Sequence, residues 1–362
     1  MTEGWLDRLG DPGALQALAQ RLSAWLTARS QADGECCVTA LQPAAGGFSN
    51  ITLLGRMHRP HREPNEPQDI VLRLQPAAGG VFANCDVARQ YLTMQRLAGT
   101  AVPVPALLGL ERDAGVIGTP FFVMARVAGQ VPNEHPLYHL KGWFHDLDEA
   151  SLRAHWFSGI DTLAAVSRLD WRAKGFSDLL PPAGVTPLAH QLANYHRHLL
   201  WAESLARPYP RLHAAQRWLL AHQPADQPLA LSWGDAKLGN CVFHQGLVAA
   251  ALDWEMAALS NPVDDLAWWL MLDESLCTGY GLPRLAGLPS RQDSVARWER
   301  ASGHSARDLP YYEVFAAWRF AILMARIGTL FMQCGLAPQA SAMDEQNGGA
   351  TMLALLGQRH GF

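Results

Sequence analysis

Lysine is scarce in this chain of 362 residues. Three of the 29 basic residues are lysines, at positions 141, 174 and 237, so the first 140 residues contain none. Charged residues make up 17% of the chain and the formal net charge is −4. Such a chain lacks the strongly basic surface that nucleic-acid binding requires. Hydrophobic residues account for 49%, which is enough for a folded globular protein of two lobes.

Several other patterns are missing. The six cysteines form neither a CxxC pair nor a Cys/His metal pattern, and dispersed cysteines are typical of reduced thiols in a cytosolic protein. No H-E-x-x-H, G-x-S-x-G or G-x-G-x-x-G occurs, so hydrolase and dinucleotide-binding functions lack support. The start, MTEGWLDRLGDPG, does not have the form of a signal peptide, and no apolar run approaches the roughly 20 residues of a membrane span. We therefore expect a cytoplasmic protein without a membrane segment.

Apolar periodicity changes along the chain. Residues 11–30 and 85–98 carry apolar side chains at helical spacing. Five strand-like runs occupy residues 38–41, 50–57, 69–74, 106–110 and 119–127. Beyond about residue 130 the chain looks helical and aromatic, and 11 of its 13 tryptophans follow residue 142. The sequence predicts an α+β protein with a mostly antiparallel region over 1–128, which includes the leading helix, and a larger helical region over 129–362.

Polar residues interrupt an apolar stretch between residues 231 and 269. Gly234 permits a tight turn that exposes Asp235, Asn240 follows five residues later, and a second apolar run delivers Asp253. Two strands flanking a turn would bring these three side chains together. A carboxylate and an amide are hard oxygen ligands suited to Mg²⁺ that carries phosphate oxygens, and a further carboxylate can accept the proton of an attacking hydroxyl. The pattern therefore predicts phosphoryl transfer.

The spacing GD(x4)N at 234–240, followed by DWExAxxxxPxxDLA at 253–267, resembles the aminoglycoside phosphotransferase-like kinases, which share the protein-kinase fold. The segments VLRLQP (71–76), GTPFFVMARVAG (118–129) and WGDAKLGN (233–240) resemble the kinase-like domain of acyl-CoA dehydrogenase family members 10 and 11. The resemblance implies a two-lobed protein-kinase-like α+β fold, with a small antiparallel N-lobe and a larger helical C-lobe. It also implies dependence on ATP and Mg²⁺. In this subgroup the implied acceptor is the hydroxyl of a 4-hydroxyacyl-CoA thioester, such as 4-hydroxyvaleryl-CoA in bacterial levulinate catabolism.

The resemblance assigns roles to the residues of the central stretch. Asp235 would be the catalytic base, and Asn240 and Asp253 would hold Mg²⁺. Lys237, two residues beyond Asp235, could reach the γ-phosphate and neutralise charge during transfer; the alternative is a solvated loop lysine. Asp265 would be a carboxylate that caps a helix or fixes a loop.

The resemblance also implies a nucleotide site in the N-terminal region. Arg73 would replace the lysine that usually holds the ATP phosphates, because its planar fork suits phosphate oxygens; the alternative is a surface arginine. Gln90 stands where a glutamate is usual, so it could accept a hydrogen bond from Arg73 without supplying charge. The remaining positions are a turn over the phosphates, at Gly46, Gly47, Phe48, Ser49 and Asn50, and a hinge at the adenine, at Met124, Ala125 and Val127.

The sequence leaves several alternatives open for the chemical identity of the acceptor substrate. Residues 270–362 contain eight acidic residues and eight arginines, so no acidic excess would attract a polycationic aminoglycoside. A group of arginines around Trp298 could receive the phosphates or adenine of coenzyme A, or could form a solvated face: Arg284, Arg291, Arg297, Arg300 and Arg307. The competing functions are a kinase of another hydroxylated metabolite or antibiotic, and a nucleotide-binding pseudokinase. The pseudokinase hypothesis is motivated by Arg73, Gln90 and Trp233, which stand where such kinases usually have a lysine, a glutamate and a histidine.

Overall fold

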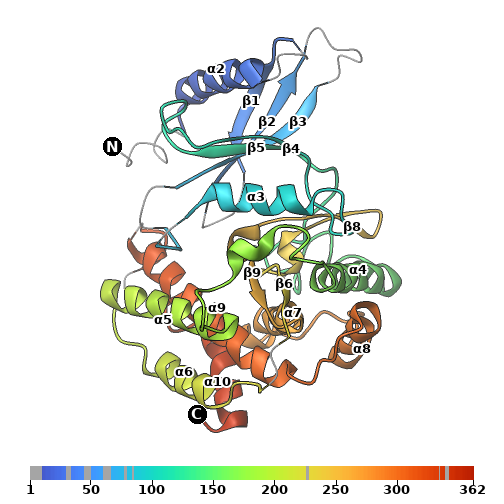
Figure 1. Ribbon diagram of the computed structural model, residues 1–362, viewed down its shortest axis with the longest axis vertical. Helices are drawn as coiled ribbons and strands as arrows, with labels where there is room; N and C mark the ends of the chain where they lie inside the picture. Colours follow the sequence, from blue (N-terminus) through green and yellow to red (C-terminus); the bar gives the residue numbers. More distant parts are fainter. Residues whose placement is uncertain are drawn as a thin grey trace. The chain divides into compact units, whose positions relative to one another are not determined.

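The chain divides into two compact units in a computed structural model, with elements labelled as in Figure 1. The structure describes residues 10–29, 34–44, 50–59, 67–76, 80–83, 85–225, 228–333, 335–338 and 342–362. The first unit comprises the described residues up to Ala98 together with Val104–Val127. The second comprises Gly99–Pro103 and the described residues from Ala128 onwards.

The first unit is built on an antiparallel sheet of five strands, drawn in blue and teal in Figure 1. Their order across the sheet is β1 (Cys37–Pro43), β2 (Ile51–His58), β3 (Gln68–Leu74), β5 (Phe121–Ala125) and β4 (Leu107–Glu111). Each strand predicted from the sequence is present, with ends shifted by a few residues. Buried residues alternate with more exposed ones in β2, whereas β3 and β5 bury consecutive residues, so both faces of the sheet are covered along these two strands.

Two helices accompany this sheet. In α2 (Pro12–Arg29) the predicted apolar stripe is buried against the sheet, with Leu22 completely covered. In α3 (Val87–Leu97) the helix begins later than predicted because Asp86 is its N-cap, where the carboxylate accepts a hydrogen bond of 2.9 Å from the N–H of Ala88. The Asp86 carboxylate is therefore used to cap the start of this helix.

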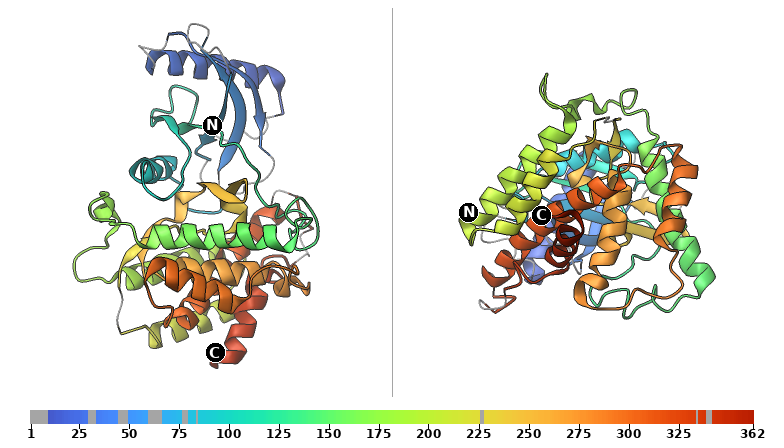
Figure 2. Two further views of the ribbon diagram at one scale, coloured as in Figure 1. Left: turned by 90° about the vertical axis from the view of Figure 1, so that its right-hand side faces the viewer. Right: turned by 90° about the horizontal axis from the view of Figure 1, so that it is seen from below.

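The second unit is mainly helical, as predicted. Its α-helices are α4 (Glu149–Ser167), α5 (Pro187–Leu205), α6 (Pro210–Ala221), α7 (Asp264–Ser275), α8 (Arg291–Ser302), α9 (Leu309–Gln333) and α10 (Gly348–His360). Helix α4 packs along α8, and α7 and α10 both pack against α9 (Figure 2). Two small antiparallel sheets complete the unit: β6 (Ala230–Ser232) pairs with β9 (Ala258–Ser260), and β7 (Cys241–His244) pairs with β8 (Leu247–Ala251).

Helix α9 corrects one expectation from the sequence. Over Leu309–Gln333 it is long and apolar enough to cross a membrane, whereas no run of that kind was expected. Within its most apolar window of 18 residues, 72% are buried inside the protein. That burial is typical of the core helix of a globular protein, which passes the same test of length and composition.

A buried ion pair joins α9 to α7. The guanidinium of Arg319 donates a hydrogen bond of 2.6 Å to Asp264, and the two side chains are 2% and 0% exposed. The guanidinium carbon lies 4.4 Å from the ring centroid of Phe315 and 4.8 Å from that of Trp268. Both charges have left water, so each depends on the other and on these aromatic rings.

We expect Asp264→Ala to lower the free energy of unfolding by about 3–5 kcal/mol, because it leaves the Arg319 charge buried without its partner. Equilibrium urea unfolding would measure the loss. The matched control is Asp161→Ala, which breaks an ion pair with Arg297 whose two side chains are 44% and 41% exposed; that change should cost less than about 1 kcal/mol. Equal losses from the two variants would contradict the account of this core.

Candidate active site

The carboxylate of Asp265 fixes the turn that leads into the site. It accepts hydrogen bonds from Ser232 Oγ at 2.8 Å, from the Trp233 N–H at 2.7 Å and from the Gly234 N–H at 3.0 Å. Gly234 has φ +89°, and a Cβ there would lie 2.3 Å from the carbonyl oxygen of Met256. Glycine is therefore required at this turn. The expectation of a loop-fixing carboxylate is confirmed.

This arrangement changes the acidity of Asp265. Burial, together with the charge of the adjacent Asp264, raises the pKa of Asp265 to about 6, although the two backbone N–H groups of Trp233 and Gly234 and the hydroxyl of Ser232 lower it. The three donors offset part of the cost of burying the charge, but burial and Asp264 have the larger effect on the pKa. The turn that presents Asp235 is thus fixed by hydrogen bonds to a carboxylate that is itself 4% exposed.

A β-hairpin brings Asn240 and Asp253 to one end. Asn240 closes the short helix η2 (Leu238–Asn240) just before β7, and Asp253 follows β8. The register pairs Cys241 with Ala251, and the Leu252 N–H donates a hydrogen bond of 2.9 Å to the Asn240 carbonyl. Asp253 has φ +61°, a conformation that aspartate tolerates better than most residues.

The carboxylate of Asp235 is held from two sides. Its Oδ1 accepts a hydrogen bond of 3.0 Å from the Trp268 indole, and its Oδ2 accepts one of 2.8 Å from the Asn240 amide. Burial raises its pKa, and the charges of Asp253 and Glu134 add to that effect, while Lys237 and Asn240 oppose it. The carboxylate is therefore oriented, and its environment makes it a stronger base than an exposed aspartate.

Lys237 is paired with a residue that the sequence did not identify. Its ammonium lies 3.0 Å from Oε1 and 3.1 Å from Oε2 of Glu134, but 3.8 Å from Oδ2 of Asp235. Burial acts to lower the pKa of Lys237, but Asp235 and Glu134 overcome it and hold the pKa above its ordinary value. Lys237 is therefore a paired and charged side chain of the site. It is not a freely solvated loop lysine.

The donor set suits a hard cation. The amide nitrogen of Asn240 points to Asp235, which turns its carbonyl oxygen away from that carboxylate. No cluster of three or more His, Cys, Asp or Glu side chains with metal-binding geometry occurs within the described ranges. A site of one amide, one carboxylate and phosphate oxygens needs no such cluster, because Mg²⁺ is commonly held by one or two carboxylates and the substrate. Asn240 and Asp253 therefore fit the predicted ion.

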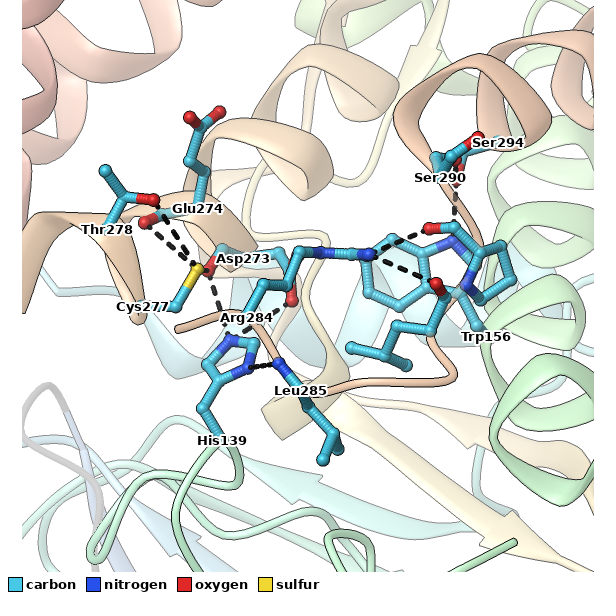
Figure 3. Close-up of polar contacts among 12 residues, drawn as sticks. His139, Trp156, Asp273, Glu274, Cys277, Thr278, Arg284, Leu285, Ser290 and Ser294 are labelled. Carbon is cyan, nitrogen blue, oxygen red and sulfur yellow. Dashed lines mark hydrogen bonds and ion pairs between the residues drawn. The ribbon is translucent and has the colours of Figure 1, made fainter. Parts of the chain in front are cut away.

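A second network of polar contacts surrounds the buried carboxylate of Asp273 (Figure 3). Asp273 accepts hydrogen bonds of 2.7 Å from the Tyr138 hydroxyl and 2.6 Å from Arg284 Nε. His139 Nδ1 accepts a hydrogen bond from the Leu285 N–H at 3.1 Å, so Nε2 is the donor; it lies 3.2 Å from the carbonyl oxygen and 3.3 Å from Oδ1 of Asp273. Burial alone would raise the pKa of Asp273, but His139 and Arg284 hold it below its ordinary value.

A cavity of about 10 Å³ separates this network from Lys237 and Glu134. That is room for a single water molecule. Trp269 also lines the cavity, and its buried indole nitrogen has no hydrogen-bond partner among the described residues.

The first unit contains the expected pair of Arg73 and Gln90. Arg73 Nη2 donates a hydrogen bond of 3.3 Å to Gln90 Oε1, and Nη1 donates one of 3.1 Å to Thr52 Oγ1. Gln90 is 1% exposed, so the acceptor is held in place by its burial. A neutral amide does bond to the strand cation, as we expected. The position of Arg73 on β3 also agrees with the expectation.

The other predicted nucleotide contacts are described only in part. Gly46, Gly47, Phe48 and Ser49 lie outside the described residues, whereas Asn50 is buried and accepts a hydrogen bond of 3.0 Å from the Cys85 thiol. At the expected hinge, Met124 pairs with both neighbouring strands, and the Ala125 N–H already donates to the Ala106 carbonyl at 2.8 Å. Of the predicted hinge positions, Val127 lies beyond the end of β5.

Fold comparison defines the class of protein. The structure superposes on a crystal structure of a candidate aminoglycoside phosphotransferase from Ralstonia eutropha with a TM-score of 0.68, covering 94% of this chain and 98% of that one at 23% identity. This likeness confirms the predicted protein-kinase-like α+β fold with an antiparallel N-terminal sheet and a helical C-lobe. Sequence comparison then identifies the family: residues 41–304 match the phosphotransferase enzyme family, and the chain belongs to it.

Two curated mouse proteins show the predicted subgroup resemblance. The chain is 28% identical to acyl-CoA dehydrogenase family member 10 over 219 residues, which is 60% of this chain and 19% of that protein. It is 27% identical to acyl-CoA dehydrogenase family member 11 over 262 residues, which is 70% of this chain and 32% of that protein. The chain thus spans between a fifth and a third of the length of these relatives.

Proposed function

We propose that this phosphotransferase uses ATP and Mg²⁺ to phosphorylate the hydroxyl of an acyl-CoA thioester, specifically a 4-hydroxyacyl-CoA such as 4-hydroxyvaleryl-CoA. The observation that carries the proposal is the Asp235 carboxylate, which two donors orient beside Asn240 and at the hairpin end that also carries Asp253. Phosphoryl transfer needs this combination of a base for the acceptor hydroxyl and hard oxygen ligands for the phosphates.

In this proposal each residue has one task. Asp235 orients the acceptor hydroxyl and takes its proton as the phosphoryl group is transferred. Asn240 and Asp253 would hold Mg²⁺, which when bound neutralises charge on the phosphate oxygens. Lys237 supplies a fixed positive charge to the transferred group. Asp235, Asn240 and Lys237 are held by hydrogen bonds or ion pairs within the second unit, so these three need little reorganisation during the reaction.

The nucleotide contacts are proposed for the first unit. Arg73 would bind the ATP phosphates, with Gln90 and Thr52 holding its guanidinium in one orientation. The backbone beyond β5, at Val127, is the proposed contact to the adenine, because the Ala125 N–H is already used within the sheet. The turn from Gly46 to Asn50 remains the proposed cover of the phosphates.

Charge around Lys237 argues against a polycationic acceptor. The two carboxylates that line the cavity there already have protein cations: Glu134 is paired with Lys237, and Asp273 with Arg284. An amine-rich antibiotic would have to displace those partners. The names of the mouse relatives supply the support for an acyl-CoA acceptor. Such a step belongs to fatty-acid or levulinate catabolism in the cytoplasm.

The five arginines around Trp298 do not add support for an acyl-CoA acceptor. Three of them are bound to acidic side chains of the same unit: Arg284 to Asp273, Arg291 to Glu313 and Arg297 to Asp161. Arg307 lies 3.6 Å from Asp308. The contacts to the phosphates of coenzyme A are therefore not assigned to this group.

The acceptor can be tested directly with the purified protein, ATP and Mg²⁺. We expect ADP release and a mass gain of one phosphate with 4-hydroxyacyl-CoAs, and neither with the acyl-CoA of equal length that lacks the hydroxyl. A chelator should abolish the reaction and excess Mg²⁺ should restore it. Phosphorylation of a sugar or an aminoglycoside in place of every hydroxyacyl-CoA would overturn the proposed acceptor.

The Arg73 assignment has its own test. Arg73→Ala should raise the KM for ATP and lower kcat, because the phosphates lose a charged fork, and Arg73→Lys should recover part of both. We expect about a tenfold loss of kcat/KM for Arg73→Ala, equivalent to roughly 1.4 kcal/mol. Steady-state kinetics would measure it, with Gln90→Glu as a companion that changes little or gains modestly. Wild-type kinetics for Arg73→Ala would show that another cation binds the phosphates.

A further inference from the structure

Glu134 reaches Lys237 from a part of the chain 103 residues earlier. It lies in the segment between β5 and α4, and its side chain is 30% exposed, against 23% for Lys237. Both carboxylate oxygens lie within 3.1 Å of the ammonium. The contact is a two-oxygen ion pair between partly buried groups, a geometry that solvent screens less than a surface pair.

The segment that carries Glu134 is anchored on both sides of the contact. Gln130 and Phe243 exchange two backbone hydrogen bonds, of 2.9 and 2.8 Å, which tie the segment to strand β7 of the catalytic hairpin. Asn133 donates from its side chain to the carbonyl of Lys141 at 2.9 Å. At the other side of the contact, a Cβ on Gly239 would lie 2.4 Å from Glu134 Oε1. Position 239 therefore has to be glycine for Glu134 to occupy its place.

The position of the Lys237 ammonium matters because the Asp235 carboxylate can still accept further hydrogen bonds. An ionised carboxylate offers about four acceptor positions. Trp268 uses one on Oδ1 and Asn240 uses one on Oδ2. The Lys237 ammonium, at 3.8 Å from Oδ2, is beyond hydrogen-bond distance. If it moved closer, it would take a further position on Oδ2, and its charge would weaken the carboxylate as a base.

We propose that Glu134 is a positioning residue of the phosphotransfer reaction, which holds the Lys237 ammonium beside the Asp235 carboxylate but beyond hydrogen-bond distance of it. This inference rests on the proposed roles of Asp235 and Lys237. In this arrangement Lys237 keeps its charge for the transferred phosphoryl group, and Asp235 keeps its basicity for the acceptor. Removing the charge of Glu134 leaves Asp235 as the remaining carboxylate within 4 Å of the ammonium among the described ion pairs.

The kinetic test compares Glu134→Gln with Glu134→Asp. Glu134→Gln should lower kcat by at least about tenfold, in line with the cost of displacing a catalytic group by about 1 Å, while the KM and the Kd for ATP change less than about twofold. Glu134→Asp keeps the charge on a shorter side chain and should recover part of kcat. Parallel loss of ATP affinity and kcat, or equal kcat for the two variants, would overturn the positioning role.

A second measurement does not need an active enzyme. The chain has three lysines, and Lys141 and Lys174 are exposed, so they serve as internal references for competitive acylation followed by mass spectrometry. The two Glu134 oxygens hold the Lys237 ammonium at 3.0 and 3.1 Å, so Glu134→Gln, which removes this ion pair, should loosen the amine and raise its labelling rate at least about threefold relative to the references. Gly239→Ala, which displaces Glu134 without removing its charge, should do the same. Asp161→Asn, at a remote exposed ion pair, should not.

The two measurements separate this inference from the proposed function. A wild-type protein that phosphorylates no hydroxylated acceptor would refute the proposed function, and the labelling of Lys237 would still decide whether Glu134 holds it. Unchanged labelling in both Glu134→Gln and Gly239→Ala, at wild-type thermal stability, would overturn the inference. Increased labelling together with wild-type kcat would show an ion pair without a positioning role, and would also overturn it.

Discussion

Three hydrogen bonds to the Asp265 carboxylate determine where the proposed catalytic residues lie. Asp265 is the second residue of α7, and its carboxylate accepts hydrogen bonds from the last residue of β6 and from the first two residues of the following turn. The turn can be placed in this way because Gly234 adopts a positive φ beside the Met256 carbonyl. Asp235 follows directly, so its backbone position is set by a helix that lies 30 residues further along the chain. Without these hydrogen bonds, the turn that carries Asp235 would not be held in a fixed position against α7.

The site is assembled from charges that would be costly to bury singly. Asp235 has Trp268 and Asn240 as donors, Glu134 has Lys237, and Asp264 has Arg319. Trp268 belongs to two of these groups: its indole nitrogen binds Asp235 and its ring lies 4.8 Å from the Arg319 guanidinium. The buried pair of α7 and α9 thus supports the residue that orients the proposed base. A substitution that disturbs the Arg319–Asp264 pair should therefore also disturb the orientation of the Asp235 carboxylate.

Local patterns in the sequence predicted much of this structure. The strands of the first unit follow from short apolar runs, and the meeting of Asn240 and Asp253 follows from two apolar runs that flank a turn. Glu134 could not be found in that way, because its contact with Lys237 spans 103 residues and the surrounding sequence has no recognisable motif. The pairing of Arg284 with Asp273 and of Arg291 with Glu313 could not be predicted either, because no sequence pattern links the partners. Composition counts charges, but it does not show which of them neutralise one another.

The central claim is that Asp235 acts on the transfer of the phosphoryl group and not on the binding of ATP. Asp235→Asn keeps the shape of the side chain and removes its basicity, so calorimetry should find nearly unchanged affinity for Mg·ATP. Phosphorylation of a hydroxyacyl-CoA, followed by mass spectrometry, should be at least about 100-fold slower, within the range of general-base contributions. Asp161→Asn provides the control for handling and stability. A loss of nucleotide affinity in proportion to turnover would contradict the account, because it would make Asp235 a ligand or a scaffold residue.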